Sequence, residues 1–314
     1  MKNKSEEKTI NQHYVPQMYL RRFGYGKVDK ERISVLKIMN GEILHSQNPR
    51  NFSSKRFFYD APREDIEKAL EFDLKSFPSL KEHELLDDIQ FAEHALSRGE
   101  SEYKKVLDLL EQDMFKIYDD SIRAVFIIFI HELAYRTASY RDKLDSINTK
   151  MEAQLNDFCD IMQISDTDRK QALEHNCVSG KDIQLEKILS LKEIYNTKDK
   201  LINNYNWYIA INNTELDFAI SDNPAQTIWM GFNDICVPIS NKKAFILRVK
   251  DSDAQMISND KPIENIINLS QRSVILYNLI QISMADLYLF GSKAIINYMK
   301  TINDLHRKGI KHDN

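Results

Sequence analysis

The hydrophobic positions between residues 61 and 196 recur with helical spacing. Ile66, Leu70 and Leu74 follow one another at intervals of four, and Asp60 and Pro62 supply the residue types that begin a helix. The segment from Ser121 to Asp142 is apolar almost all round, as in a buried helix. The pattern predicts a break at Arg98-Gly99 and helices over 63–76, 80–97, 100–118, 120–147, 150–163, 167–177 and 181–196.

Alternating patterns on either side of this region predict strands. Residues 33–38 and 42–45 flank Asn40-Gly41, which favours a β-hairpin with a type I′ turn, and residues 57–59 form a third extended segment. Further on, the chain predicts an antiparallel sheet, which the hairpin could join, from residues 207–211, 216–220, 235–239 and 244–249. Residues 263–304 predict one long helix or two abutting helices.

Together these elements predict an α+β fold that is predominantly helical, with a small N-terminal β-hairpin and an antiparallel sheet in the C-terminal half. The 314 residues suffice for one large core, and low counts of glycine (8) and proline (7) favour long helices. We expect a single domain over residues 1–314, divided into the opening motif and hairpin (11–60), the helical region (61–196), the sheet (197–250) and the C-terminal helices (262–304).

Charge and cysteine content narrow the class of protein. The net charge of −4 gives no overall attraction to nucleic acid, which stays a candidate partner only through a local basic surface. The three cysteines lack a CxxC pair, and the chain has no common metal-binding or nucleotide-binding motif, so we expect reduced thiols and no metal site. No apolar run could span a membrane and no signal peptide is evident, so we expect a cytoplasmic protein; the cofactor and oligomeric state stay unknown.

The densest polar chemistry lies just inside the N-terminus, in residues 13–24. Pro16 fits the first turn of a short helix that Gly24 ends. One face of this helix is apolar and includes Tyr19, and we expect it to dock there. The same stretch places polar groups around it that could form a site: His13, Tyr14, Gln17 and Arg22.

Two later stretches carry further candidates. On the apolar helix, His131 shares a face with Tyr135, and Glu132 shares the next with Arg136; an intrahelical ion pair beside a satisfied core histidine is as good an interpretation as a site. After the predicted second strand, Asp222 and Asn223 could form a structural turn or present a carboxylate and an amide to a cleft. Asn278 lies in an apolar pattern and needs partners if it is buried.

These stretches resemble one family over nearly the whole chain. His13-Tyr14-Val15-Pro16 with Tyr19-Leu20 and Phe23 matches the HxVPxxYLxxF opening of a largely bacterial family, the domain of unknown function numbered four-two-three-eight. Matches follow in order at 58–59, 134–137, 221–224, Asn278 and Ala285. Thr137-Ala138 stands where the family pattern often has Thr-Pro. The resemblance implies a family without an established activity.

Two hypotheses of function remain. The first is a hydrolase that cleaves a phosphodiester, as a nuclease-like effector in a toxin or phage-defence context, with His13 and Asp222 catalytic; Tyr14, Gln17, Tyr19, Arg22, Arg136, Asn223 and Asn278 would then bind the substrate. The second is a non-enzymatic ligand-binding or sensor module with a buried polar network that fixes the fold or holds a small ligand, formed by His13, Gln17, Arg136, Asp222 and Asn278. A cleft that exposes both His13 and Asp222 favours the first, and a solvent-free network favours the second.

Overall fold

The N-terminal motif forms the first elements of the protein. In the computed structural model, which describes residues 8–28, 30–225, 233–250 and 256–310, β1 (Asn11–His13) pairs antiparallel with β4 (Ser54–Arg56). Pro16 then starts the short helix α1 (Gln17–Arg21), whose buried face includes Tyr19 and Leu20, as predicted. The third extended segment was predicted at 57–59; the strand lies before it instead, because the positive φ of Phe57 (51°) ends β4.

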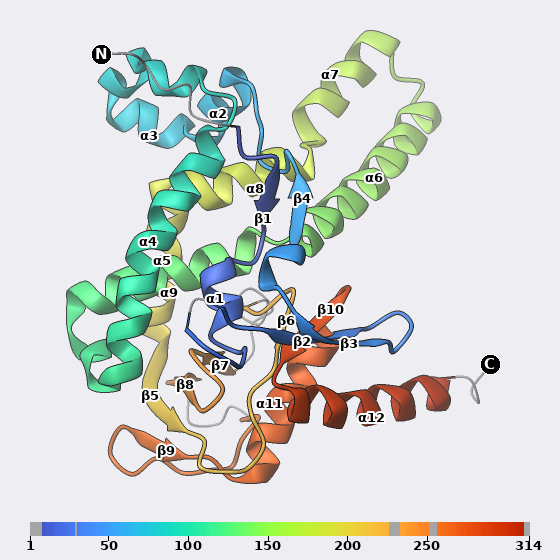
Figure 1. The fold of residues 1–314 in the computed structure, drawn as a ribbon. Helices are drawn as coiled ribbons and strands as arrows, with labels where there is room; N and C mark the ends of the chain where they lie inside the picture. The colour runs from blue at the N-terminus through green and yellow to red at the C-terminus, as the bar shows by residue number, and fades with distance from the viewer. Residues whose placement is uncertain (1–7, 29, 226–232, 251–255, 311–314) are drawn as a thin grey trace.

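Two four-stranded sheets occupy the lower half of Figure 1. In the first, β10 (Tyr288–Gly291) joins the hairpin of β2 (Ile33–Lys37) and β3 (Ile43–Gln47) to β6 (Ile220–Ser221). The second has the order β7-β8-β5-β9, with β7 (Asp234–Pro238), β8 (Lys243–Val249) and β5 (Tyr205–Ile211) antiparallel and β9 (Ile266–Asn268) parallel to β5.

The α+β class is therefore confirmed, but the strand pairing differs from the prediction in three ways. Residues 216–219 form no strand, and β6 leaves the predicted sheet to pair with β10. The hairpin joins that other sheet through β10, and its turn is not type I′, because only Gly41 of the Asn40-Gly41 pair has positive φ. Residues 197–204 belong to a helix, and residues 226–232 of the predicted sheet region lie outside the described residues.

Helices dominate the middle of the chain. The α-helices there are α2 (Arg63–Ala69), α3 (Glu71–Ser76), α4 (Phe91–Gln112), α5 (Asp120–Tyr135), α6 (Ala138–Ile161), α7 (Asp166–Asn176), α8 (Gly180–Leu189) and α9 (Leu191–Asn204). Short 3-10 turns lie between the longer elements: η1 (Pro49–Asn51), η2 (Pro78–Glu82), η3 (Glu84–Asp87) and η4 (Met114–Tyr118).

The predicted break at Arg98-Gly99 is wrong, because α4 continues through both residues. Gly99 has a packing role: a Cβ at this position would lie 2.6 Å from the hydroxyl oxygen of Tyr103, one turn further along. The missing side chain leaves room for the Tyr103 ring against the helix.

The predicted 120–147 helix is in fact two helices. Arg136 ends α5, and the hydroxyl of Thr137 accepts a hydrogen bond from the backbone N–H of Tyr140 at the start of α6. Thr137 is thus an N-cap, a residue type that begins helices. No break occurs at 148–149, so α6 runs on to Ile161.

The C-terminal segment also has a strand that the sequence pattern did not show. α11 (Gln271–Met284) and α12 (Lys293–Ile310) do not abut, because β10 lies between them and pairs with β2. Four apolar or small residues between two helical segments carry too little alternation to indicate a strand.

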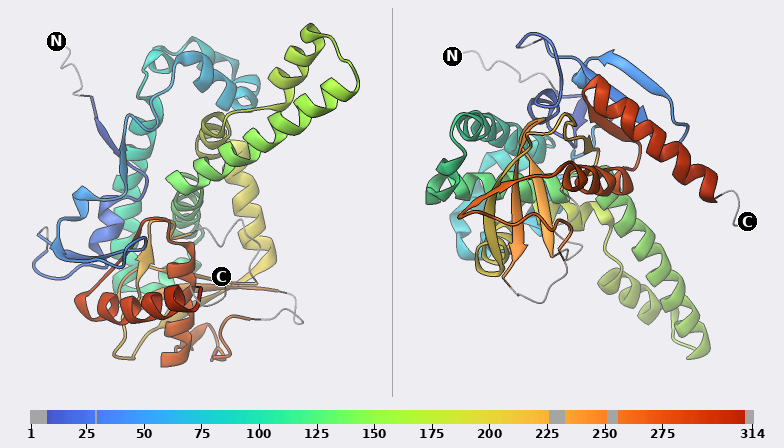
Figure 2. Two further views of the ribbon diagram at one scale, coloured as in Figure 1. Left: turned by 90° about the vertical axis from the view of Figure 1, so that its right-hand side faces the viewer. Right: turned by 90° about the horizontal axis from the view of Figure 1, so that it is seen from below.

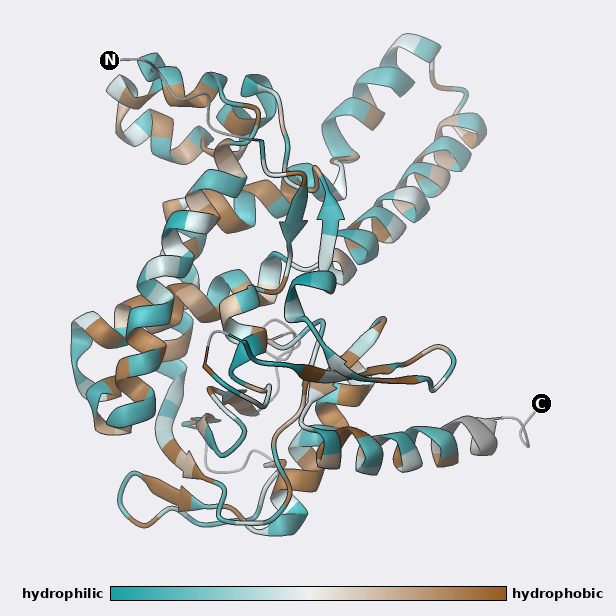
Figure 3. Ribbon diagram, viewed as in Figure 1, coloured by the Kyte–Doolittle hydropathy of each residue, from teal (hydrophilic) through white to brown (hydrophobic). Residues whose placement is uncertain are grey.

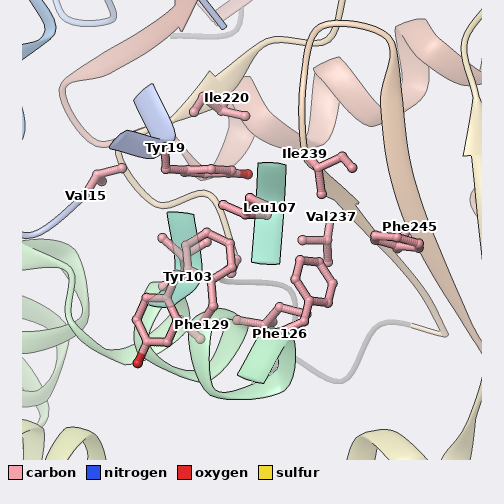
Figure 4. Close-up of a cluster of buried hydrophobic side chains, with 14 of the residues drawn as sticks. Val15, Tyr19, Tyr103, Leu107, Phe126, Phe129, Ile220, Val237, Ile239 and Phe245 are labelled. Carbon is pink, nitrogen blue, oxygen red and sulfur yellow. The ribbon is translucent and has the colours of Figure 1, made fainter. Parts of the chain in front are cut away.

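The core lies where α1, α4 and α5 meet the second sheet. Figure 4 shows the rings of Tyr19, Phe129 and Phe126 one after another across this core. Phe126 in turn contacts Phe245 of β8, with ring centroids 5.1 Å apart. From this core α6 and α7 project away as an arm, which is clear in both Figure 1 and Figure 2.

Candidate functional site

The sequence-predicted site residues do not converge on one point. The structure divides them into three places: a surface cleft beside β1 and α1, the junction of β6 with α11, and the buried contact of α1 with α4 and β7. His13, Gln17 and Arg136 belong to the first place; Asp222, Asn223 and Asn278 belong to the second; Tyr19 and Arg22 belong to the third.

The cleft has a volume of about 740 Å³ and polar walls. Helix α4 contributes Glu93, Ser97 and Glu100, which share one face because they are spaced at i, i+4 and i+7. The opposite wall comes from the opening motif and from η1, and includes Lys8, Asn11, His13, Gln17, Arg21 and Arg50. The opening motif therefore does line a cavity, as its polar density indicated.

His13 is held as a neutral imidazole in this wall. Its Nε2 lies 2.8 Å from the side-chain nitrogen of Gln17, which can only donate, so Nε2 accepts. Burial, followed by the nearby Arg136 charge, lowers the pKa of His13 from 6.5 to about 4, although a hydrogen-bonding interaction with the Phe52 backbone acts in the opposite direction. At neutral pH the ring thus carries an accepting nitrogen and no charge.

Arg136 lies behind His13, with only 1% of its surface exposed. One terminal nitrogen donates to the backbone carbonyl of His13 (2.5 Å) and to a carboxylate oxygen of Glu100 (3.0 Å), and the other lies 3.7 Å from Glu132. The Tyr59 hydroxyl donates to the Arg136 carbonyl (2.6 Å). Three of the matching family stretches, those around His13, Tyr59 and Arg136, therefore meet at Arg136, through its guanidinium and its backbone carbonyl.

Glu132 completes the buried part of the network. Its carboxylate accepts a hydrogen bond from the Tyr103 hydroxyl at 2.5 Å. Burial raises the pKa of Glu132 from 4.5 to about 7, although Arg136 and the hydrogen bond from Tyr103 lower it. The predicted Glu132–Arg136 pair thus exists, but it is enclosed in the protein and does not lie at a solvent-exposed helix end.

His131, on the adjacent face of α5, is a satisfied core residue. Its Nδ1 lies 2.7 Å from the hydroxyl of Thr197, and its Nε2 lies 2.5 Å from the carbonyl of Lys187. Because the carbonyl can only accept, Nε2 carries the proton. Burial lowers the pKa of His131 to about 4, so this ring is also neutral.

Glu93, in the α4 wall of the cleft, is a carboxyl with a raised pKa. Burial, with a smaller contribution from Glu100, raises its pKa from 4.5 to about 7, while Arg136 acts in the opposite direction. One of its carboxylate oxygens is buried and has no hydrogen-bond partner among the described residues. A group with these properties can accept or release a proton near pH 7.

The two arginines of the cleft differ in whether an ion pair already occupies them. Arg21 pairs with Glu31 at 3.1 Å. Arg50 is exposed and forms no ion pair with any residue that the structure describes, and its charge contributes to the lowered pKa of His13. Arg50 is therefore free to meet an anion that enters beside His13.

Asp222 does not line this cleft. It is 2% exposed, and its carboxylate accepts backbone hydrogen bonds from Asp286 (2.9 Å), Leu287 (2.8 Å) and Tyr288 (3.3 Å) at the start of β10. Burial raises the pKa of Asp222 to about 6, and the three backbone donors oppose that shift. In this geometry the carboxylate stabilises the turn into β10.

Asn223 and Asn278 have similar structural contacts. The Asn278 side chain accepts from the Ala219 N–H and donates to the Asp217 carbonyl, both at 2.9 Å, so it fastens the segment before β6 to α11. The Asn223 amide donates to the Met284 carbonyl at 2.9 Å. The need of a buried Asn278 for partners is met in full.

The remaining predicted binding residues are also engaged within the fold. The hydroxyl of Tyr19 donates to the Pro238 carbonyl, and Arg22 binds the Ile239 carbonyl and the carboxylate of Asp108, each at 2.7 Å. Tyr14 is buried, and burial raises the pKa of its phenol, with a further contribution from Asp222. The phenol of Tyr14 therefore lies close enough to Asp222 and Tyr288, at the β10 junction, to be affected by their charges.

Glu93 and Glu100 were not predicted from the sequence. Their spacing places them on one helix face, but a polar face is typical of every surface helix. What distinguishes them is their proximity to Arg136 and His13, which come from other parts of the chain.

Within the described part of the chain, no group of three or more histidine, cysteine, aspartate or glutamate residues could hold a metal ion. In the same residues no helix is long and apolar enough to cross a membrane. The three cysteines are free thiols.

Fold and site together define an α+β protein with a polar cleft between its N-terminal motif and one long helix. The chain belongs to the family described as "Protein of unknown function (DUF4238)", which matches residues 11–294 and confirms the resemblance drawn from its motifs. Neither the curated proteins nor the solved structures contain a match.

Proposed function

We propose that the protein is a hydrolase that cleaves phosphodiesters in the cleft lined by His13 and Glu93. One observation carries the proposal: a carboxyl whose pKa is about 7 shares a cleft with a neutral imidazole and an arginine that has no ion-pair partner among the described residues. Pairs of titratable groups with oppositely shifted pKa values are typical of acid–base sites.

Each residue then has a distinct role. Arg50, with Lys8 nearby, binds the phosphate oxygens. Glu93, as a carboxylate, takes a proton from water while the water oxygen bonds to phosphorus and the bond from phosphorus to the leaving oxygen breaks. The leaving oxygen takes up a proton from solvent, and Glu93 returns its own proton to solvent. The accepting Nε2 of His13 orients the water or a substrate hydroxyl when either displaces the amide of Gln17.

This proposal changes the assignment of catalytic groups. Glu93 replaces Asp222 as the partner of His13, because Asp222 is buried away from the cleft with its oxygens bound by backbone N–H groups. Arg136 becomes a positioning residue that holds the His13 backbone and Glu100.

The test is cleavage of fluorescent RNA, single-stranded DNA and double-stranded DNA by the purified protein. We expect Glu93→Gln to lose at least 100-fold in rate with a melting temperature no lower than that of the parent, because removal of a buried carboxyl with a raised pKa does not destabilise the fold near neutral pH. Glu102→Gln, an exposed change on the same helix, is the matched control and should keep the parental rate. If none of the three substrates is cut, or if Glu93→Gln cuts as fast as Glu102→Gln, the proposal is wrong.

The cellular role that we propose is that of a toxin-like or phage-defence effector. Expression of the parent in bacteria should slow growth and degrade nucleic acid, whereas expression of Glu93→Gln should do neither. Growth that is equally slow with both proteins would show that toxicity arises elsewhere.

The second candidate is a module that binds a small anion without cleaving it. The network in which the buried Arg136 holds Glu132 and the cleft residue Glu100 favours it, because such a network can fix the geometry of a binding wall without any chemistry. Stabilisation of the parent by inorganic phosphate or a mononucleotide, lost in Arg50→Ala and unaccompanied by turnover, would support this candidate over the hydrolase.

A further inference from the structure

The arm of α6 and α7 presents an apolar stripe that the fold does not cover. Along α6, Ile147 is 56% exposed, Met151 42%, Phe158 54% and Ile161 78%. Figure 3 shows apolar positions recurring among polar ones along this helix, and the views in Figure 2 show the arm standing clear of both sheets. Soluble proteins seldom expose large apolar side chains in a contiguous row without a partner.

The spacing of the stripe identifies the kind of partner. Leu144, Ile147, Met151, Gln154, Phe158 and Ile161, which we call the α6 stripe, alternate at intervals of three and four residues. This is the spacing of the a and d positions of a coiled coil, whose side chains fit between those of a second helix. A helix with the same spacing is therefore the complementary surface.

We propose that the α6 stripe pairs with the α6 stripe of a second copy of this chain, with the two helices antiparallel. The charged residues beside the stripe indicate that the partner is a second copy of the chain and that the two helices run antiparallel. Lys150 and Asp157 both occupy the flanking position that precedes an a residue, both are exposed, and neither forms an ion pair within the described chain.

An antiparallel pair places Lys150 of each copy beside Asp157 of the other, so two opposite-charge contacts form by symmetry. A parallel pair would instead place these charges beside Leu155 and Met162, which are apolar. Gln154 lies near the centre of the antiparallel arrangement, where a polar residue helps to fix the register.

The length of the stripe sets the expected strength. Residues 147–161 span about 22 Å of helix, so the contact is smaller than the roughly 1,600 Å² of a standard protein interface. We therefore expect a dimer that dissociates in the micromolar range.

Sedimentation equilibrium of the full chain from 1 to 100 µM tests the proposal. The apparent mass of the parent should rise from one to two times 36.8 kDa across this range. Phe158→Asp should weaken association at least 100-fold and remain a monomer. Phe115→Asp changes an equally exposed phenylalanine (54%) on η4 and should associate like the parent. A parent that stays monomeric at 100 µM, or two variants that behave alike, would overturn the proposal.

Charge reversal tests the direction. Lys150→Glu and Asp157→Lys alone should each weaken association about tenfold, because each creates two repulsive contacts by symmetry. The double variant should restore the parental dissociation constant. A double variant as weak as the single ones would exclude the antiparallel register.

Discussion

The buried carboxyl of Glu132 makes folding stability depend on pH in a way that one substitution should remove. Folding raises the pKa of Glu132 from 4.5 to about 7, mainly through burial. Between these values the folded protein holds a proton that the unfolded chain has released. The contribution of this carboxyl to the free energy of unfolding is thus most favourable below pH 4.5 and is lost as the pH rises to 7.

The size of the effect follows from this shift. Each pKa unit corresponds to about 1.4 kcal/mol, so from pH 5 to pH 8 this carboxyl should lower the free energy of unfolding by roughly 2 to 3 kcal/mol. Glu132→Gln keeps an acceptor for the Tyr103 hydroxyl but cannot ionise. The variant should therefore gain roughly 2 to 3 kcal/mol relative to the parent when the pH rises from 5 to 8.

Urea unfolding of parent and variant at pH 5 and pH 8 measures this difference directly. Glu186→Gln, a change at an exposed glutamate on α8, is the control and should follow the parent at both values. If Glu132→Gln and the parent show the same change in stability with pH, the carboxyl is not buried in the protonated form that the structure implies.

Two further substitutions test the corrected helix boundaries. Gly99→Ala should destabilise the protein by about 1 to 3 kcal/mol, although alanine normally favours a helix. The reason is that the new Cβ would meet the Tyr103 ring, which Glu132 holds in place by a hydrogen bond. Thermal unfolding measures the change in stability, and a gain would contradict the packing role of this glycine. Thr137→Ala should lower the free energy of unfolding by about 1 kcal/mol, because the N-cap of α6 is lost. Thr149→Ala, inside α6, is the comparison, and equal losses of stability for the two variants would argue against the cap.

The sequence predicted elements better than boundaries and pairing. The apolar period from Val125 to Leu133 correctly indicated a buried helix, because periodicity reflects burial directly. The helix break predicted at Gly99 was wrong because this glycine has a role in tertiary packing. It makes room for Tyr103, and an isolated glycine in a sequence does not show that. β10 was missed because its hydrogen bonds go to β2, some 250 residues earlier, and strand pairing of this kind leaves little local signal.

The candidate site was predicted in part for a related reason. The opening motif concentrates unusual polar groups in a few residues, so His13 and Gln17 stood out, and both line the cleft. Glu93 has an ordinary helical setting in the sequence, and its pKa is raised by burial in the fold, with a smaller contribution from Glu100 and against the opposing charge of Arg136. Asp222 was an equally strong catalytic candidate in the sequence, but its carboxylate oxygens accept hydrogen bonds from the backbone N–H groups that lead into β10.

The measurement that tests the central claim most directly compares Glu93→Gln with Asp222→Asn in one cleavage assay and one melting experiment. The account predicts that Glu93→Gln melts no lower than the parent and loses cleavage. It also predicts that Asp222→Asn melts lower, because a charged acceptor of three backbone hydrogen bonds is lost, and yet keeps the parental rate per folded molecule. Full activity in Glu93→Gln together with loss of activity in a stably folded Asp222→Asn would contradict it.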